Sequence, residues 1–193
     1  CPDMGDGESA HRNEFGITKG TGWSSKGKVL GVERMDQTRG TDYPLVNTAT
    51  RIAEVNNIKY PMAGMKSHEV TVGIFDLSTE KTVYLKTRRN ESVEEREMYL
   101  TNITWTPDEK YVYIAKLNRD QNHMWLECYD ALSGELVRTL FEEKNDKYVE
   151  PQTGLYFLPK KEDQFIWLSQ RDGYNHLYLY DIKGNLIKQS TKG

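Results

Sequence analysis

The sequence predicts an all-β fold, a partial β-propeller of about three four-stranded antiparallel blades preceded by an N-terminal loop. Composition is the first reason, because aromatic residues make up 11% of the 193 residues and aromatic side chains favour strands over helices. A repeat is the second reason, since a pattern of four short strands separated by turn residues occurs three times along the chain. We expect the helix content to be low.

Two marks occur in the same order in each repeat. An Asp follows the third strand at Asp76, Asp130 and Asp181, which are 54 and 51 residues apart. An Arg and an Asp close the second strand, at Arg34-Asp36, Arg119-Asp120 and Arg171-Asp172. These marks divide the chain into an N-terminal loop over residues 1–20 and blades at about 21–87, 100–144 and 153–193.

The middle strands indicate how the blades associate. In YVYIAKL, Val112 and Ile114 lie on one face of the strand, and Tyr111, Tyr113 and Ala115 lie on the other. A sheet that is apolar on both faces must be stacked between two neighbours, which is the arrangement of a propeller.

Three blades do not close a ring, because propellers usually take 4–8 blades. The chain also begins at Cys1 without a Met. We therefore expect it to be an excised piece of a longer protein. The end blades are expected to expose their outer faces and to self-associate through them. A homo-oligomer is therefore expected.

Several segments interrupt or join the blades. The first blade carries an insertion at about 37–68, which is predicted to be extended because Tyr43-Pro44 and Tyr60-Pro61 disfavour helix. The charged run TRRNESVEERE, residues 87–97, is predicted to be a solvated loop between the first two blades. The N-terminal segment CPDMGDGESA is rich in Gly and Asp and is predicted to be a loop.

Some rarer residue types are assigned to packing. Cys128 lies in a strand-like run and is predicted to be a small buried thiol. Core packing is also preferred over ligand stacking for the tryptophans, which recur at strand positions: Trp23, Trp105, Trp125 and Trp167.

The sequence argues against several functions. A net charge of −3 gives no electrostatic footprint for nucleic acid, and no apolar run approaches the roughly 18 residues of a membrane span. No G-x-S-x-G elbow, phosphate-binding loop or H-E-x-x-H motif occurs. We assign no catalytic residue and no cofactor, and no metal ligand because the histidines have no ligand spacing: His11, His68, His123 and His176.

One loop contains a candidate binding residue. HRNEFGITKGTGWSSKG, residues 11–27, holds a single carboxylate, Glu14, just ahead of the first blade. One reading is an exposed acid in a loop. The other is a carboxylate that binds an ammonium group, with Arg12 on the same loop lowering the pKa of Glu14 and keeping it ionised.

The order of several motifs resembles the propeller of the dipeptidyl peptidase IV family, and is especially similar to its bacterial prolyl tripeptidyl aminopeptidases. The resemblance runs from about Ala10 to Gly193, and its main motifs are HRNEFG, GWSSKGKVLGVERMDQ, YPMAG and RDGYNHLYLYD. It implies a serine exopeptidase that removes short N-terminal peptides ending in proline. In such proteins an eight-bladed propeller caps a C-terminal α/β-hydrolase domain that carries the Ser-Asp-His triad. This chain would supply about three blades and would be inactive alone.

The resemblance also implies a role for the HRNEFG loop. The family places paired glutamates there, which grip the free amino group of the peptide substrate. The second falls on Glu14 and the first on Asn13, so this sequence departs from the paired pattern. We expect Glu14, with Asn13 and Arg12 beside it, to bind the substrate amino terminus. A single acid puts dipeptide release in doubt and fits tripeptide release, and both stay open.

Two further expectations follow. The resemblance implies an extracytoplasmic location, in the periplasm or at the cell surface. The repeats alone are equally compatible with a non-enzymatic propeller that binds proteins or glycans, as in TolB-like modules.

Overall fold

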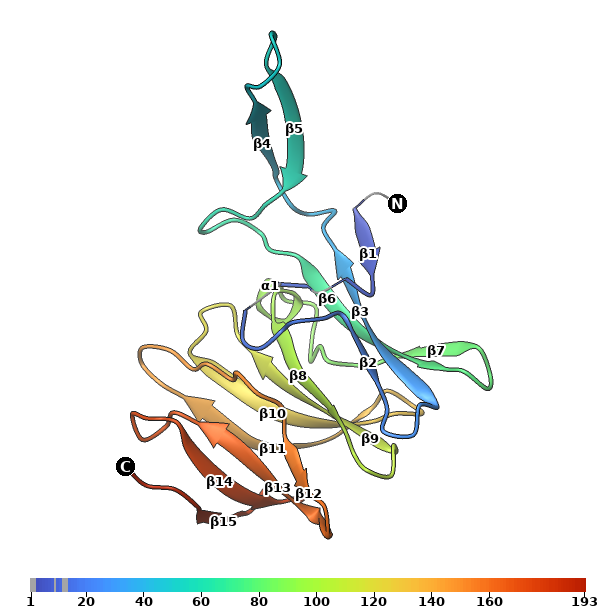
Figure 1. The fold of residues 1–193 in the computed structure, drawn as a ribbon, viewed down its shortest axis with the longest axis vertical. Coiled ribbons are helices and arrows are strands. Elements are labelled where there is room, and N and C mark those ends of the chain that lie inside the picture. The colour runs from blue at the N-terminus through green and yellow to red at the C-terminus, as the bar shows by residue number, and fades with distance from the viewer. Residues whose placement is uncertain (1–2, 9, 12–13) are drawn as a thin grey trace.

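The computed structural model describes residues 3–8, 10–11 and 14–193. Three antiparallel sheets lie one beside the next and a separate two-stranded hairpin projects from them (Figure 1). The single helix among the described residues is α1 (Val93–Arg96). The predicted all-β class and the low helix content are therefore confirmed. This helix falls far short of the length and hydrophobicity that a membrane-spanning helix needs.

The first sheet has the order β1-β3-β6-β7, with β2 also paired to β3. Its strands are β1 (Met4–Asp6), β2 (Thr21–Trp23), β3 (Val29–Asp36), β6 (Glu69–Asp76) and β7 (Lys81–Tyr84). β2 pairs with the first half of β3, and β1 pairs with the second half. The prediction that the N-terminal segment is only a loop was wrong at β1, because β2 is too short to cover all of β3.

The second and third sheets are simple meanders in which each strand pairs with the next. The second contains β8 (Tyr99–Trp105), β9 (Tyr111–Leu117), β10 (His123–Asp130) and β11 (Leu136–Lys144). The third contains β12 (Tyr156–Leu158), β13 (Lys161–Ser169), β14 (His176–Asp181) and β15 (Leu186–Gln189).

The repeated Asp has a structural cause. In the second sheet, the Oδ1 atom of Asp130 accepts hydrogen bonds from the backbone N–H groups of Leu132 and Ser133, at 3.1 and 2.8 Å. Asp76 and Asp181 close the corresponding turns in the same way. Hydrogen bonding to the ionised form lowers the pKa of each of these carboxyls. The regular spacing of these three Asp residues therefore reflects a repeated turn that is capped by a carboxylate.

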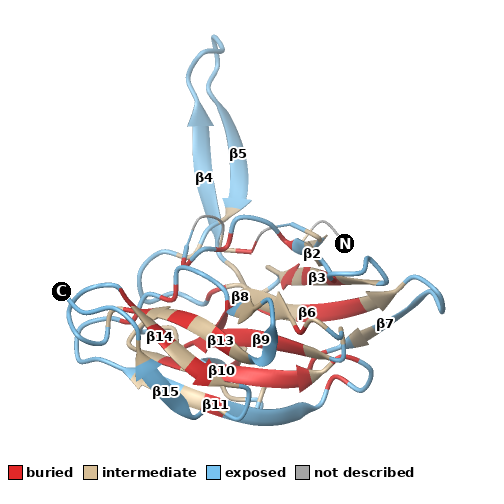
Figure 2. Cartoon of the chain, turned by 60° about the horizontal axis from the view of Figure 1, so that its bottom comes forward, coloured by how far each residue is buried: buried red, intermediate tan, exposed pale blue. Residues whose placement is uncertain are grey.

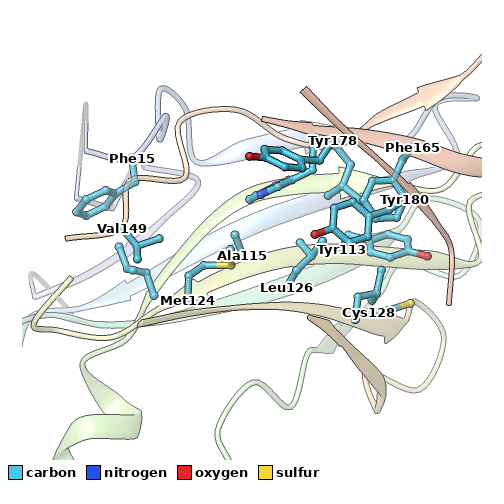
Figure 3. Close-up of a cluster of buried hydrophobic side chains, with 14 of the residues drawn as sticks. Phe15, Tyr113, Ala115, Met124, Leu126, Cys128, Val149, Phe165, Tyr178 and Tyr180 are labelled. Carbon is cyan, nitrogen blue, oxygen red and sulfur yellow. The ribbon is translucent and has the colours of Figure 1, made fainter. Parts of the chain in front are cut away.

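The middle strands of the second sheet, β9 and β10, are buried on both faces, as the alternation in YVYIAKL predicts, whereas β11 is mostly exposed (Figure 2). Val112 and Ile114 are fully buried against the first sheet, in a cluster with Val72 and Ile74. Tyr113 and Ala115 point to the other side, toward Phe165 and other residues of the third sheet (Figure 3). Cys128 belongs to this second cluster as a free buried thiol, and its prediction is confirmed.

The tryptophans do not all pack in the core. Trp167 on β13 is 1% exposed and lies in the cluster between the second and third sheets. Trp105 and Trp125 are half-buried. Trp23 is 57% exposed, so the prediction of core packing was wrong there, because β2 lies at the edge of the first sheet.

The charged run at 87–97 is solvated only in part, so the prediction of a solvated loop was wrong for its buried residues. Glu95, at the start of α1, and Glu97, just after it, are both buried. Lys116 of β9 is 1% exposed and donates hydrogen bonds to Glu95 at 2.5 Å and to the Thr87 carbonyl at 2.6 Å. The run therefore inserts charged side chains between the first two sheets.

Glu69 of β6 pairs with three arginines of this region, while Arg89 pairs with Glu127. The Glu69 carboxylate accepts from Arg39 and from Arg88, the latter at 3.0 Å, and lies 3.3 Å from a guanidinium nitrogen of Arg96. Burial acts to raise the pKa of Glu69, but hydrogen bonding to Arg39 and the three positive charges outweigh it, so the pKa is lowered. One carboxylate thus ties the base of the insertion to the segment around α1.

The insertion itself is a β-hairpin of β4 (Asp42–Asn47) and β5 (Glu54–Lys59). It projects away from the three sheets, and nearly all its residues are exposed (Figure 2). The sequence predicted an extended segment here but not the pairing of its two halves.

Replacing Lys116 with Met is expected to lower the free energy of unfolding by about 3–5 kcal/mol, because it leaves the Glu95 carboxylate buried without its ion-pair partner. Urea unfolding of the chain measures this. The double variant Lys116→Met with Glu95→Leu removes both charges and should recover at least half of the loss. Equal losses in the single and double variants would contradict the pairing.

Candidate functional site

The loop that leads from β1 to β2 carries the predicted binding residue. Glu14 is exposed, whereas Arg12 and Asn13, the other two predicted residues, lie outside the described residues. The backbone N–H of Glu14 donates to the His11 carbonyl at 3.0 Å, and the Glu14 carbonyl accepts from Ile17 at 2.8 Å. Glu14 therefore lies between two hydrogen-bonded turns with its side chain free to meet a ligand.

The residue after Glu14 anchors the loop in the core. Phe15 has a φ of +47° and its ring packs edge-on against Tyr99, with centroids 5.0 Å apart. The hydroxyl of Thr101 donates to the Phe15 carbonyl at 2.6 Å. Figure 3 shows Phe15 beside Val149, at one end of the cluster between the second and third sheets. Both Tyr99 and Thr101 belong to β8, so the second sheet holds the loop.

Gly16 brings a third segment into contact with the loop. Its φ is +77°, and a Cβ at this position would lie 2.2 Å from the Gln152 carbonyl oxygen. The side-chain amide of Asn102 donates to the Pro151 carbonyl at 2.8 Å, which holds that segment in place. Only glycine combines this backbone angle with such a close approach.

The start of the loop is fixed from the first sheet. The backbone N–H of Ala10 donates to Oε2 of Glu33 at 3.0 Å, and both residues are buried. Burial raises the pKa of Glu33 to about 7, although the hydrogen bond from Ala10 acts to lower it. A buried acid with an elevated pKa is unusual on a sheet face that is otherwise apolar.

Two histidines that are far apart in sequence meet beside the loop. The ring of His11 packs edge-on against Tyr99 at 4.6 Å and stacks with His68 at 6.0 Å. Burial, together with the charges of His68 and Arg119, lowers the pKa of His11 to about 4. His11 is therefore neutral near pH 7. The spacing of these residues gave no signal of this contact.

The chemistry available here is binding and not bond cleavage. An exposed carboxylate on a loop with anchored neighbours can accept charge-assisted hydrogen bonds from an ammonium group. Within the described ranges, no group of three or more His, Cys, Asp or Glu side chains is placed to hold a metal ion.

A cavity of about 510 Å³ lies between the ends of β11 and β13 and the segment that follows β11. Its most buried acid, Glu143, accepts from the Trp167 indole, from Ser169 and from Arg171, all at 2.6–2.7 Å. These contacts satisfy the carboxylate internally, so we do not place a binding function on it.

Comparison with known families gives a match to the model of the dipeptidyl peptidase IV N-terminal region, over residues 5–193. Curated relatives include a probable dipeptidyl-aminopeptidase B of Coccidioides posadasii, 25% identical over 191 residues, and one of Pyrenophora tritici-repentis, 26% identical over 184 residues. These alignments cover 89% and 84% of this chain but only 20% and 21% of the relatives. The chain therefore spans about a fifth of their length.

Solved structures show the same likeness. The chain is similar over its full length to a putative dipeptidyl aminopeptidase IV from Bacteroides ovatus, with a TM-score of 0.92, 46% identity and 29% of that chain covered. It is also similar to a dipeptidyl peptidase 4 from Porphyromonas gingivalis, with a TM-score of 0.83 and 24% identity over 99% of this chain and 27% of that one. The second likeness supports the fold alone.

Replacing Thr101 with Val is expected to lower the free energy of unfolding by about 1–3 kcal/mol, because the shape is kept while the buried Phe15 carbonyl loses its donor. Thermal or urea unfolding measures the change. Thr104→Val is the matched control, since Thr104 makes a similar bond to a backbone carbonyl but is only half-buried. A Thr101 variant no less stable than the control would contradict the anchoring role.

Glu33 is expected to make stability depend on pH. Its folded-state pKa of about 7 lies above its usual 4.5, so the folded state binds the proton more tightly. Stability from this group is present below pH 4.5 and is lost as the pH rises to about 7. The measurement is the free energy of unfolding of Glu33→Gln and of the unchanged chain across pH 4–8. The value for the variant minus the value for the unchanged chain should rise through this window. A constant difference would contradict the assignment.

Proposed function

This chain belongs to the family of dipeptidyl peptidase IV N-terminal regions, since the family model matches residues 5–193, and from that premise we propose that it is the propeller portion of a serine exopeptidase. The parent protein releases N-terminal dipeptides or tripeptides after proline. Its Ser-Asp-His triad lies in a C-terminal α/β-hydrolase domain, which is the partner of this chain. The names of the relatives as dipeptidyl peptidases support this proposal.

In this proposal the chain anchors the free amino terminus of the peptide substrate, and Glu14 is the residue that binds it. The observation that carries the assignment is the construction of the loop. Glu14 is exposed, yet its neighbours Phe15 and Ala10 are fixed to two different sheets. An exposed carboxylate between anchored residues is suited to binding a charged ligand group at a fixed position.

The energy of this contact explains selectivity for a free amino terminus. A hydrogen bond between an ammonium group and a carboxylate contributes about 1.5–3 kcal/mol. An N-terminally blocked peptide offers no such charge, and it leaves Glu14 desolvated and unpaired once the hydrolase domain covers the site. The chain thus selects exopeptidase substrates while another domain performs the chemistry.

The pair Asn13-Glu14 bears on the length of the peptide released. One acid in place of two favours tripeptide release over dipeptide release in our proposal. Arg12 and Asn13 are proposed to contribute to the same site from the same loop. An extracytoplasmic location, in the periplasm or at the cell surface, and a homo-oligomer formed through exposed faces also belong to the proposal.

Replacing Glu14 with Gln in the full-length protein is expected to lower kcat/KM for peptides with a free amino terminus by about tenfold or more, from the loss of a charge-assisted hydrogen bond. Hydrolysis of the N-acylated peptide should not fall and should rise, because the variant has no carboxylate that a blocked peptide would leave desolvated and unpaired. Glu80→Gln is the matched control, because Glu80 is also exposed and lies in a turn. Unchanged selectivity for free amino termini in the Glu14 variant would refute this role.

A further inference from the structure

Glu33 interrupts an otherwise apolar face of the first sheet. Alternate residues of β3 are buried toward the second sheet, at Gly31, Glu33 and Met35. Met35 lies in the apolar cluster between these sheets, and so does Val72, which pairs with Glu33 across the ladder. A carboxylate that is 3% exposed in such surroundings costs stability unless it is hydrogen-bonded.

Glu33 makes three hydrogen bonds to the two ends of the loop that carries Glu14. At the start of the loop, its carbonyl accepts from Gly7 at 2.8 Å and its carboxylate accepts from Ala10 at 3.0 Å. At the end of the loop, its backbone N–H donates to Gly20 at 2.7 Å. A single residue of β3 thus closes the loop at its base.

The two ends of the loop also touch each other. A Cβ on Gly20 would lie 2.2 Å from the Glu8 carbonyl oxygen, so the segment before the loop crosses directly over the segment after it. Compact loops whose ends are held together keep their shape through their base. The backbone bonds of Glu33 would survive substitution, whereas the bond to Ala10 belongs to the side chain and can be removed by mutation.

We propose that Glu33 is a positioning residue, whose carboxylate fixes the Ala10 amide and through it the place of Glu14. This inference rests on the proposed function, because it needs Glu14 to bind the substrate amino terminus. Glu33 itself touches no substrate. Glu33 acts on Glu14 through the hydrogen bond to Ala10, which lies four positions before Glu14 in the sequence.

The surroundings of Glu33 leave this bond as its main polar contact. Lys19 and Asn102 line the same cavity of about 200 Å³, and Lys19 is exposed. Glu8, on the crossing segment, is exposed as well. Among the described residues, the Ala10 amide is the hydrogen-bond partner of this carboxylate, so we assign the positioning to this bond.

The test uses the full-length protein and two substitutions. Glu33→Gln keeps an oxygen that can accept from Ala10, and it should leave KM for a free-amino peptide within about twofold of the unchanged enzyme. Glu33→Leu has no acceptor, and it should raise KM about tenfold with little change in kcat. Glu127→Leu is the control for removing a buried acid between the same sheets, and it should not raise KM.

A double-mutant cycle separates positioning from general damage. If Glu33 acts through Glu14, then Glu33→Leu should change KM little in a protein that already carries Glu14→Gln. Additive effects of the two substitutions would overturn the proposal. So would a KM for Glu33→Gln as high as that for Glu33→Leu.

Hydrogen exchange separates this proposal from the proposed function. In the full-length protein, amides of residues 10–17 should exchange faster in Glu33→Leu than in Glu33→Gln or Glu127→Leu at the same pH. If Glu14→Gln leaves selectivity unchanged, the proposed function fails, and exchange alone then decides whether Glu33 orders the loop. Equal exchange in all three variants would overturn the anchoring itself.

Discussion

The middle strands of the second sheet, β9 and β10, are buried on both faces, and the two faces are packed with different chemistry. Toward the third sheet the packing is apolar, with Tyr113 and Leu126 in one continuous cluster. Toward the first sheet it changes along β9, from Val112 and Ile114 to Lys116. A lysine buried at such a place requires a carboxylate, and the segment around α1 supplies Glu95. The linker between the first two sheets is therefore also part of their interface.

The candidate site depends on that stacking. Its loop belongs in sequence to the first sheet, through Ala10 and Glu33, but its anchor Phe15 is held by β8 of the second sheet. Gly16 then fits beneath the segment that leads to the third sheet. Glu14 keeps its place only while three sheets keep theirs, so substitutions in distant strands can alter ligand binding without touching the ligand.

The sequence predicted the repeated turns and the alternation of side chains between the two faces of a strand. The turns at Asp76, Asp130 and Asp181 recur at regular spacing, and the alternation in β9 identified both buried faces. It did not predict contacts that depend on tertiary structure alone. The run at 87–97 has the composition of a surface loop, and its partner Lys116 lies well outside it in sequence. Glu33 occupies a buried position by alternation, but nothing in the spacing points to Ala10 as its partner.

The closure of the loop at its base has a consequence for how such sites diversify. Both ends of the loop meet at one residue of β3, and Phe15 and Gly16 hold its middle against other segments, so only an exposed position such as Glu14 can change with little demand on the blade below. The number of acids in the loop can then change, as at Asn13-Glu14, without rebuilding its scaffold. The exposed chemistry of the loop can therefore vary while the architecture stays constant.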